Sequence, residues 1–167
     1  MKLDRETLIQ QMTDYVINVL EERRPEFSGL PVCPFVKPDR ITNQLHFDVF
    51  DNNEDTLVDV VLRFVRSGKR SALIAQPNEE IDFAETKGYQ KFINLVAKET
   101  AGKDIAALCF NPSTQMEIEG YNPYQDAPFF MINFAYVDDL SAARKKLLQT
   151  SYYDKMSDRY KKYLNIK

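Results

Sequence analysis

Apolar side chains recur three and four positions apart in several stretches of the chain, which is typical of amphipathic helices. Residues 5–22, 55–67 and 82–99 show this spacing, and glycines follow the second and third stretches. The same spacing returns from Asp138 to the C-terminus, where it predicts one helix and then a second helix or a continuation of the first. The pattern therefore predicts a helix at each end of the chain and two between them.

Four other stretches are shorter and follow a different pattern. Residues 45–50 (LHFDVF) alternate between apolar and polar positions, which predicts a strand with one partly polar face. Residues 71–76, 105–110 and 129–137 are short apolar runs that end at turn residues, so we interpret them as buried strands. The strand at 129–137 is the most hydrophobic of the four.

The predicted elements follow the order α-β-α-β-α-β-β-α. Strands that alternate with helices are typical of right-handed parallel crossovers, and the last strand can return antiparallel beside the third. We therefore expect one α/β domain over residues 1–167, with a small, mixed, mostly parallel four-stranded sheet and flanking helices.

Composition narrows the classes of protein to consider. The net charge of −3 argues against an overall basic surface, so we expect no nucleic-acid partner. No apolar run is long enough to span a membrane or resembles a signal peptide, so we expect no membrane partner and a cytoplasmic location. The two cysteines, Cys33 and Cys109, are too few for a disulfide scaffold, and we interpret them as free thiols.

Polar residues follow each of the first three predicted strands. Gln76 ends the second strand, while Asn111 and Gln115 follow the third. Because the carboxyl ends of parallel strands meet at one edge of a sheet, these side chains could bind a polar ligand there. Asparagine, serine and proline are also ordinary turn residues, which is the alternative interpretation.

Three prolines frame Cys33 in the segment 30–38 (LPVCPFVKP), which restricts the backbone around the thiol. A nucleophilic cysteine needs a nearby cation, histidine or helix N-terminus to lower its pKa. Lys37, Arg40 and His46 could supply the charge. The alternative is a buried structural thiol, as most free cysteines are.

His46 is the only histidine, and it shares one face of its predicted strand with Asp48. The pair could share a proton or, as a weaker alternative, bind a metal together with Cys109 or Asn111 from another strand. The alternative is simply a polar strand face. We expect no cofactor, and the nucleotide-binding, hydrolase and zinc-protease motifs are absent from the sequence.

Two further regions combine aromatic and polar residues. The loop 116–127 contains Asn122 and Tyr124 and could cover a pocket, or it could be a surface excursion. The tyrosines and lysines of residues 152–163 could form a partner surface. They are explained as well by an amphipathic helix that docks on the domain.

The segment 30–37 (LPVCPFVK) resembles the Leu-x-x-Cys-Pro-Phe-Ala element of a bacterial family described as a domain of unknown function. In that family a strand runs into Phe-His-Pro and then a polar, Asn- and Pro-rich segment; here Phe110-Asn111-Pro112 stands at that place. The resemblance implies that Cys33, Asn111 and loop 111–128 form one region. The family's histidine is replaced by Asn111, and its arginine has no evident counterpart, so an activity that needs them is in doubt.

Our leading hypothesis is a small enzyme or biosynthetic accessory protein that binds a polar small molecule between the Cys33 loop and loop 111–128. Cys33 and His46 are the candidate catalytic residues. The candidate ligand-binding residues are Gln76, Asn111, Gln115, Asn122 and Tyr124. The alternative is a non-catalytic interaction or homodimerisation module.

Overall fold

A four-stranded mixed sheet organises the structure, which is a computed structural model that describes residues 4–166. Its strands are β3 (Leu45–Val49), β4 (Ser71–Ala75), β5 (Ile105–Phe110) and β6 (Met131–Tyr136). They lie in the order β3-β4-β6-β5, and only β3 and β4 are parallel neighbours. β6 runs antiparallel to both β4 and β5.

The mixed α/β class is thus confirmed, but the prediction of mostly parallel pairing is wrong. β6 returns beside β5, as expected, and it also separates β5 from β4. Two of the three neighbouring pairs are therefore antiparallel. β3, β4 and β5 still run in the same direction, so their carboxyl ends lie at one edge of the sheet.

Local capping explains where the two helices between the strands begin and end. α3 (Leu57–Ser67) starts with a capping box between Thr56 and Asp59 and ends at Gly68, which has a φ of +68°. α4 (Phe83–Ala101) starts at Asp82, whose side chain accepts the Glu85 N–H. Both helices lie where the apolar spacing predicts them.

The predicted N-terminal helix is divided. α1 (Arg5–Tyr15) continues into a π-helical turn, η1 (Val16–Leu20). The chain beyond this turn is less irregular than the prolines suggest, because four short elements follow. They are β1 (Arg23–Arg24), η2 (Pro25–Phe27), β2 (Leu30–Pro31) and α2 (Val36–Ile41).

The C-terminal region forms two separate helices. α5 (Val137–Leu147) follows β6 directly, and α6 (Asp158–Tyr163) comes after a segment of turns. Tyr152, Tyr153 and Tyr160 are buried, which agrees with the docking interpretation of this region.

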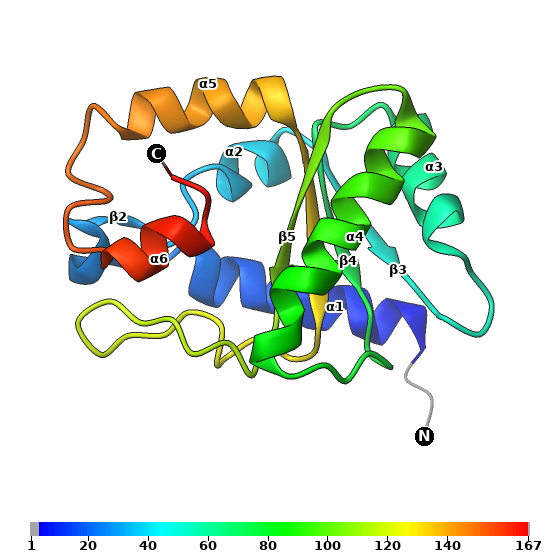
Figure 1. Cartoon of the computed structure of the whole chain (residues 1–167), viewed down its shortest axis with the longest axis horizontal. Coiled ribbons are helices and arrows are strands. Elements are labelled where there is room, and N and C mark those ends of the chain that lie inside the picture. The colour runs from blue at the N-terminus through cyan, green and yellow to red at the C-terminus, as the bar shows by residue number, and fades with distance from the viewer. Residues whose placement is uncertain (1–3, 167) are drawn as a thin grey trace.

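Helices cover both faces of the sheet, and each face carries its own apolar cluster (Figure 1). On the α3–α4 face, α3 and α4 pack against Ala72, Ile74 and Phe134. On the opposite face, which we call the α1 face, α1 packs with Leu73 and Met131. Among the helices described, none is long and apolar enough to cross a lipid bilayer.

Candidate functional site

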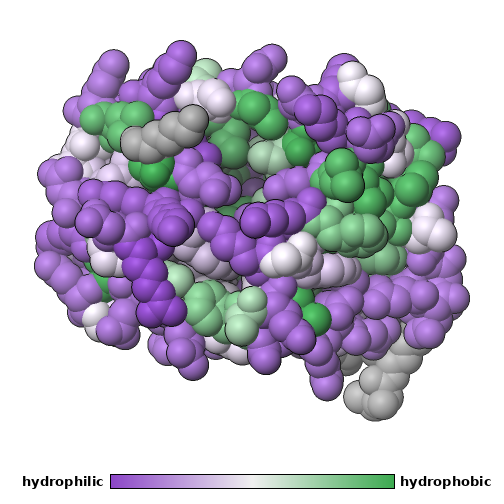
Figure 2. Space-filling view, in the orientation of Figure 1, coloured by the Kyte–Doolittle hydropathy of each residue, from purple (hydrophilic) through white to green (hydrophobic). Residues whose placement is uncertain are grey.

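A cavity of about 160 Å³, which we call the C-terminal cavity, lies over β5 and β6 on the α1 face. Its wall is formed by η1 and η2, the Cys33 loop, loop 111–128, the strands β5 and β6, α4, and the chain from α5 to Ile166. In Figure 2, which has the orientation of Figure 1, the molecule is hollowed beside α5, and both hydrophobic and hydrophilic residues surround the hollow. Its lining includes Cys33, Gln90, Asn94, Ala106, Leu108, Tyr124, Asn133, Ala135, Leu140, Arg144, Tyr152, Tyr153, Tyr160 and Ile166.

The cavity exists because the helices of the α1 face are unevenly placed. α1 lies on the same face of the sheet as the cavity, but it packs on the other two strands, β3 and β4. Over β5 and β6 the sheet presents small or polar side chains, Ala106, Asn133 and Ala135. Leu108 and Phe110 of β5 line the wall as well, but the small or polar side chains leave space between the sheet and the C-terminal helices.

Two carboxamides from α4 close the open edge of the sheet beside the cavity. Asn94 Oδ1 accepts the Ala107 N–H at 2.5 Å, and Gln90 Oε1 accepts the Cys109 N–H at 2.9 Å. Edge strands with unpaired backbone groups invite pairing with another chain, and these side chains occupy the groups instead. Gln90 and Asn94 are thus structural as well as part of the cavity wall.

Four buried tyrosines give the cavity an aromatic, weakly polar wall. The Tyr152 hydroxyl donates to the Val32 carbonyl, and the Tyr160 hydroxyl lies 3.5 Å from that of Tyr124. Burial raises the pKa of Tyr124, Tyr152, Tyr153 and Tyr160 above the usual value. These hydroxyls therefore remain protonated and neutral at pH 7.

Arg144 brings a charge to this wall from α5. Its Nη2 donates to the Leu164 carbonyl at 2.9 Å, which ties α5 to the residues after α6. Burial lowers the pKa of Arg144, but a guanidinium keeps its proton at neutral pH. Among residues 4–166, no carboxylate forms an ion pair with it.

Cys33 lines the cavity, but its surroundings do not activate the thiol. Its N–H donates to the Leu20 carbonyl at 2.8 Å, where the π-helical turn ends. Burial raises the pKa of Cys33, and the nearby carboxylates Asp39 and Glu21 raise it further. Arg40, one of the expected cations, instead donates to Glu21 at 2.5 and 2.9 Å.

His46 does not meet Cys33, because the two lie on opposite sides of the sheet. His46 pairs in register with Ala72, which faces α3 and α4, whereas Cys33 packs against the apolar cluster of the α1 face. The neighbour of His46 is Asp48, whose Oδ2 is 3.7 Å from His46 Nε2. This distance is too long for a hydrogen bond.

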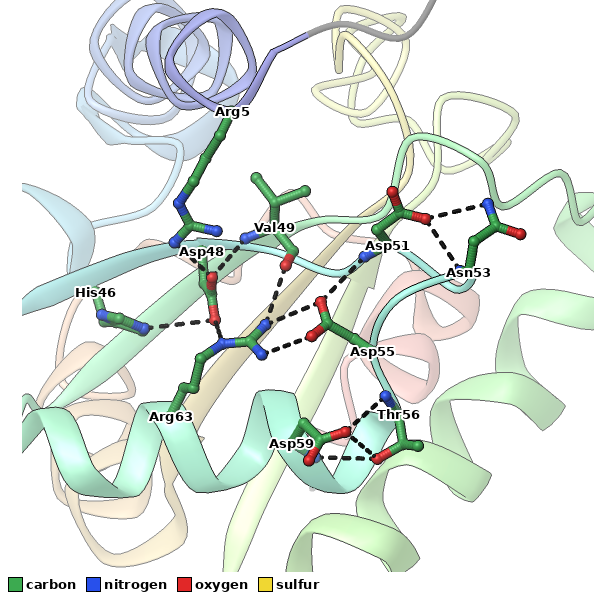
Figure 3. Close-up of polar contacts among 10 residues, drawn as sticks. All are labelled: Arg5, His46, Asp48, Val49, Asp51, Asn53, Asp55, Thr56, Asp59 and Arg63. Atoms are coloured by element: carbon green, nitrogen blue, oxygen red, sulfur yellow. Dashed lines mark hydrogen bonds and ion pairs between the residues drawn. The ribbon is translucent and has the colours of Figure 1, made fainter.

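Asp48 forms the centre of a compact charge cluster at the edge strand β3 (Figure 3). Its fully buried carboxylate accepts from Arg63 Nε and Arg5 Nη2, both at 2.7 Å, and from the Val49 N–H at 2.8 Å. Arg63 also forms a two-point contact with Asp55 at 2.8 and 3.2 Å. Burial opposes ionisation of Asp48, but its contacts with His46, Arg63 and Arg5 hold its pKa well below the usual value.

This arrangement does not favour the metal site considered for His46 and Asp48. Two guanidinium groups occupy the carboxylate oxygens, and they would repel a metal cation. Cys109 lies on β5, at the opposite edge of the sheet from β3. Within residues 4–166 no group of three or more His, Cys, Asp or Glu side chains is arranged to hold a metal.

The polar residues at the strand ends do gather at one edge, but they bind one another. Gln76, fully buried, contacts Asn52 at 3.0 Å, Glu79 at 3.0 Å and the Tyr89 hydroxyl at 2.8 Å. Because these partners satisfy its amide, Gln76 is a structural residue in this geometry. It does not line the C-terminal cavity.

Asn111 is similarly occupied. Its Nδ2 donates to the Ile81 carbonyl and the Thr86 hydroxyl, while its Oδ1 accepts from Ser113. Asn122 braces its own loop through Thr114 and Tyr124, and Gln115 is exposed. Of the five predicted ligand-binding residues, the cavity wall includes Tyr124 alone.

The structure thus brings Cys33 and Tyr124 together at one cavity and leaves the other candidates elsewhere. Sequence reasoning missed Asn94, Asn133 and Arg144 as wall residues. Asn133 interrupts the most hydrophobic strand, and this was the one usable signal. Searches of protein-family models, curated proteins and solved structures found no match to this chain, and the family resemblance of the Cys33 segment stays a prediction.

Proposed function

We propose that the protein binds a small molecule in the C-terminal cavity, between the Cys33 loop and loop 111–128. The observation that carries this proposal is the cavity itself, with about 160 Å³ of space lined by regions far apart in the sequence. A protein that keeps such a space beside a well-packed sheet is best explained by a ligand that fills it.

The wall favours a ligand more apolar than the polar molecule expected from the sequence. Leu108, Leu140 and Ile166 supply aliphatic surface, and the four tyrosines supply aromatic faces. An apolar cavity of about 150 Å³ accepts a molecule the size of benzene. The proposed ligand is therefore a single-ring or short branched molecule.

The geometry supports a binding role more than catalysis by Cys33. Burial raises the pKa of Cys33, and the sheet separates the thiol from His46. We therefore assign Cys33 to the cavity wall and leave His46 outside the site. The proposed cytoplasmic location rests on the two free cysteines, Cys33 and Cys109.

The test is a titration followed by amide chemical shifts in two-dimensional NMR spectra. Toluene, benzamide and benzoate would be added separately to the wild-type protein and to Ala135→Met, which places a long side chain in the cavity. We expect saturable shifts at Ala106, Leu108 and Ala135 in the wild type and their loss in the variant. Absence of saturable binding by all three compounds, or equal binding by the variant, would overturn the proposal.

A second candidate function, homodimerisation, has one specific observation in its favour. Phe92 and Leu95 on α4 are 54% and 59% exposed, and Figure 2 shows a hydrophobic patch over α4. Sedimentation equilibrium tests this alternative. A monomer–dimer equilibrium that Leu95→Lys abolishes would support it, and a strict monomer at high concentration would contradict it.

A further inference from the structure

Arg144 differs from the other partly buried arginines in having no carboxylate partner among residues 4–166. Arg24 pairs with Glu26, Arg40 with Glu21, and Arg63 with both Asp48 and Asp55. Arg144 has only the Leu164 carbonyl, which occupies one Nη2 donor at 2.9 Å. The remaining N–H groups of its planar fork have no partner among the described residues, although burial makes such partners valuable.

Arg144 also lines the C-terminal cavity. Arg144 is the only charged side chain among the described residues that line it. Tyr153 lies close enough to Arg144 for each to affect the pKa of the other. Within the described part of the chain, the cavity thus combines one cation that has no carboxylate partner with a wall that is otherwise aromatic, aliphatic or neutral.

These features together specify the chemistry of the ligand. From them we infer that the cavity takes a small monocarboxylate with an apolar body, and that Arg144 binds the carboxylate; this inference rests on the proposed function. The planar guanidinium matches a carboxylate with two parallel hydrogen bonds. A dicarboxylate or a phosphate dianion fits less well, because the wall residues within 4–166 include no second cation to balance a second charge.

The experiment compares benzoate with benzamide, which has nearly the same shape and no charge. Isothermal titration calorimetry should show that the wild type binds benzoate about tenfold or more tightly than benzamide. Arg144→Gln should remove this preference and leave the affinity for benzamide within about threefold of the wild type. Added salt should weaken benzoate binding and leave benzamide binding unchanged.

Lys145→Gln is the matched control, because Lys145 is exposed on the same helix and the variant loses the same charge. It should keep the preference for benzoate. If Arg144→Gln does not fold, Arg144→Met serves as the second variant, and the salt dependence of the wild type provides an independent reading.

The outcomes separate the two proposals. Equal wild-type affinity for benzoate and benzamide would overturn the role of Arg144 and preserve a neutral ligand site. A benzoate preference that persists in a folded Arg144 variant, or disappears in Lys145→Gln, would also overturn it. Failure of both compounds and of toluene to bind would instead overturn the proposed function.

Discussion

Two regions hold charged side chains away from water. They are the charge cluster around Asp48, which we call the β3–α3 corner, and the C-terminal cavity, and they differ in the partners that these charges have. At the corner, the buried carboxylate of Asp48 accepts hydrogen bonds from Arg5, Arg63 and the Val49 N–H. At the cavity, Arg144 is held by one carbonyl and faces a space of about 160 Å³. At the corner, the protein itself supplies the partners of the buried carboxylate, whereas the cavity has space and a cation with few partners among the described residues.

This difference separates structural charge from functional charge. A buried group whose partners are all supplied by the protein has no capacity left for a ligand, even where its pKa is strongly shifted. Asp48 and its neighbours therefore stabilise the fold, although the sequence pattern His46-x-Asp48 suggested chemistry. Arg144 is a better candidate for binding because the described residues leave most of its donors unused.

The largest expected effect comes from breaking the satisfied cluster. Asp48→Asn removes the buried charge that pairs with Arg5 and leaves Arg63 with Asp55 alone, and we expect a loss of about 3 kcal/mol in the free energy of unfolding. Urea denaturation followed by circular dichroism measures this change. Asp14→Asn, at an exposed position on α1, is the control and should change stability by no more than about 0.5 kcal/mol. Equal effects of the two substitutions would show that the cluster does not stabilise the fold.

The pH dependence of the free energy of unfolding provides a second test of the structural role of Asp48. The pKa of Asp48 is lower in the folded than in the unfolded chain, whose ordinary value is 3.8. Its contribution to stability is therefore complete well above pH 4 and is lost as the pH falls towards the folded-state pKa. The stability difference between the wild type and Asp48→Asn should be about 1 kcal/mol smaller at pH 3 than at pH 7. A difference that stays constant or grows as the pH falls would refute this explanation.

Two alanines on neighbouring strands compare the packed and hollow faces of the sheet directly. Ala72 on β4 is fully buried against α3 and α4, so Ala72→Met should overpack the core and cost about 2 kcal/mol. Ala135 on β6 faces the cavity, so Ala135→Met should bury new apolar surface and stabilise the protein by up to about 1 kcal/mol. Thermal unfolding measures both. If the two variants were equally destabilised, the C-terminal cavity would not be open space.

The smallest expected effect concerns the reactivity of Cys33. Because the thiolate is the reacting form and burial raises the pKa of Cys33, iodoacetamide at pH 8 should modify it at least about tenfold more slowly in the folded protein than in urea. Mass spectrometry of the Cys33 peptide measures the rate, with buried Cys109 as the internal control. If iodoacetamide modifies Cys33 in the folded protein as fast as in urea, Cys33 is again a candidate nucleophile.

Sequence patterns predicted the elements whose limits depend on nearby residues. The strand at 105–110 has the predicted limits, and α3 lies between its Thr56 cap and Gly68. The insertion of β6 between β4 and β5 could not be predicted, because strand order depends on pairing between distant segments. The π-helical turn Val16–Leu20 could not be predicted either, since it accompanies a contact between Leu20 and the distant Cys33 loop.

The candidate site was predicted only in part, because it also depends on contacts between segments that are distant in the sequence. Composition and turn chemistry placed polar residues at the strand ends, and Gln76 does contact Asn52 and Glu79 there. Which of them keep free hydrogen-bonding groups depends on their partners in space, and these partners use the groups of Gln76 and Asn111. Arg144 resembles an ordinary surface arginine of an amphipathic helix until the cavity beside it is known.

The most direct test of ligand binding in the C-terminal cavity is a crystal structure of the protein soaked with 4-bromobenzoate. We predict an anomalous bromine peak inside the C-terminal cavity, with the carboxylate directed at Arg144. The same soak of Ala135→Met should show no bromine there. An empty cavity at a saturating concentration, or bromine bound only elsewhere on the molecule, would contradict the account.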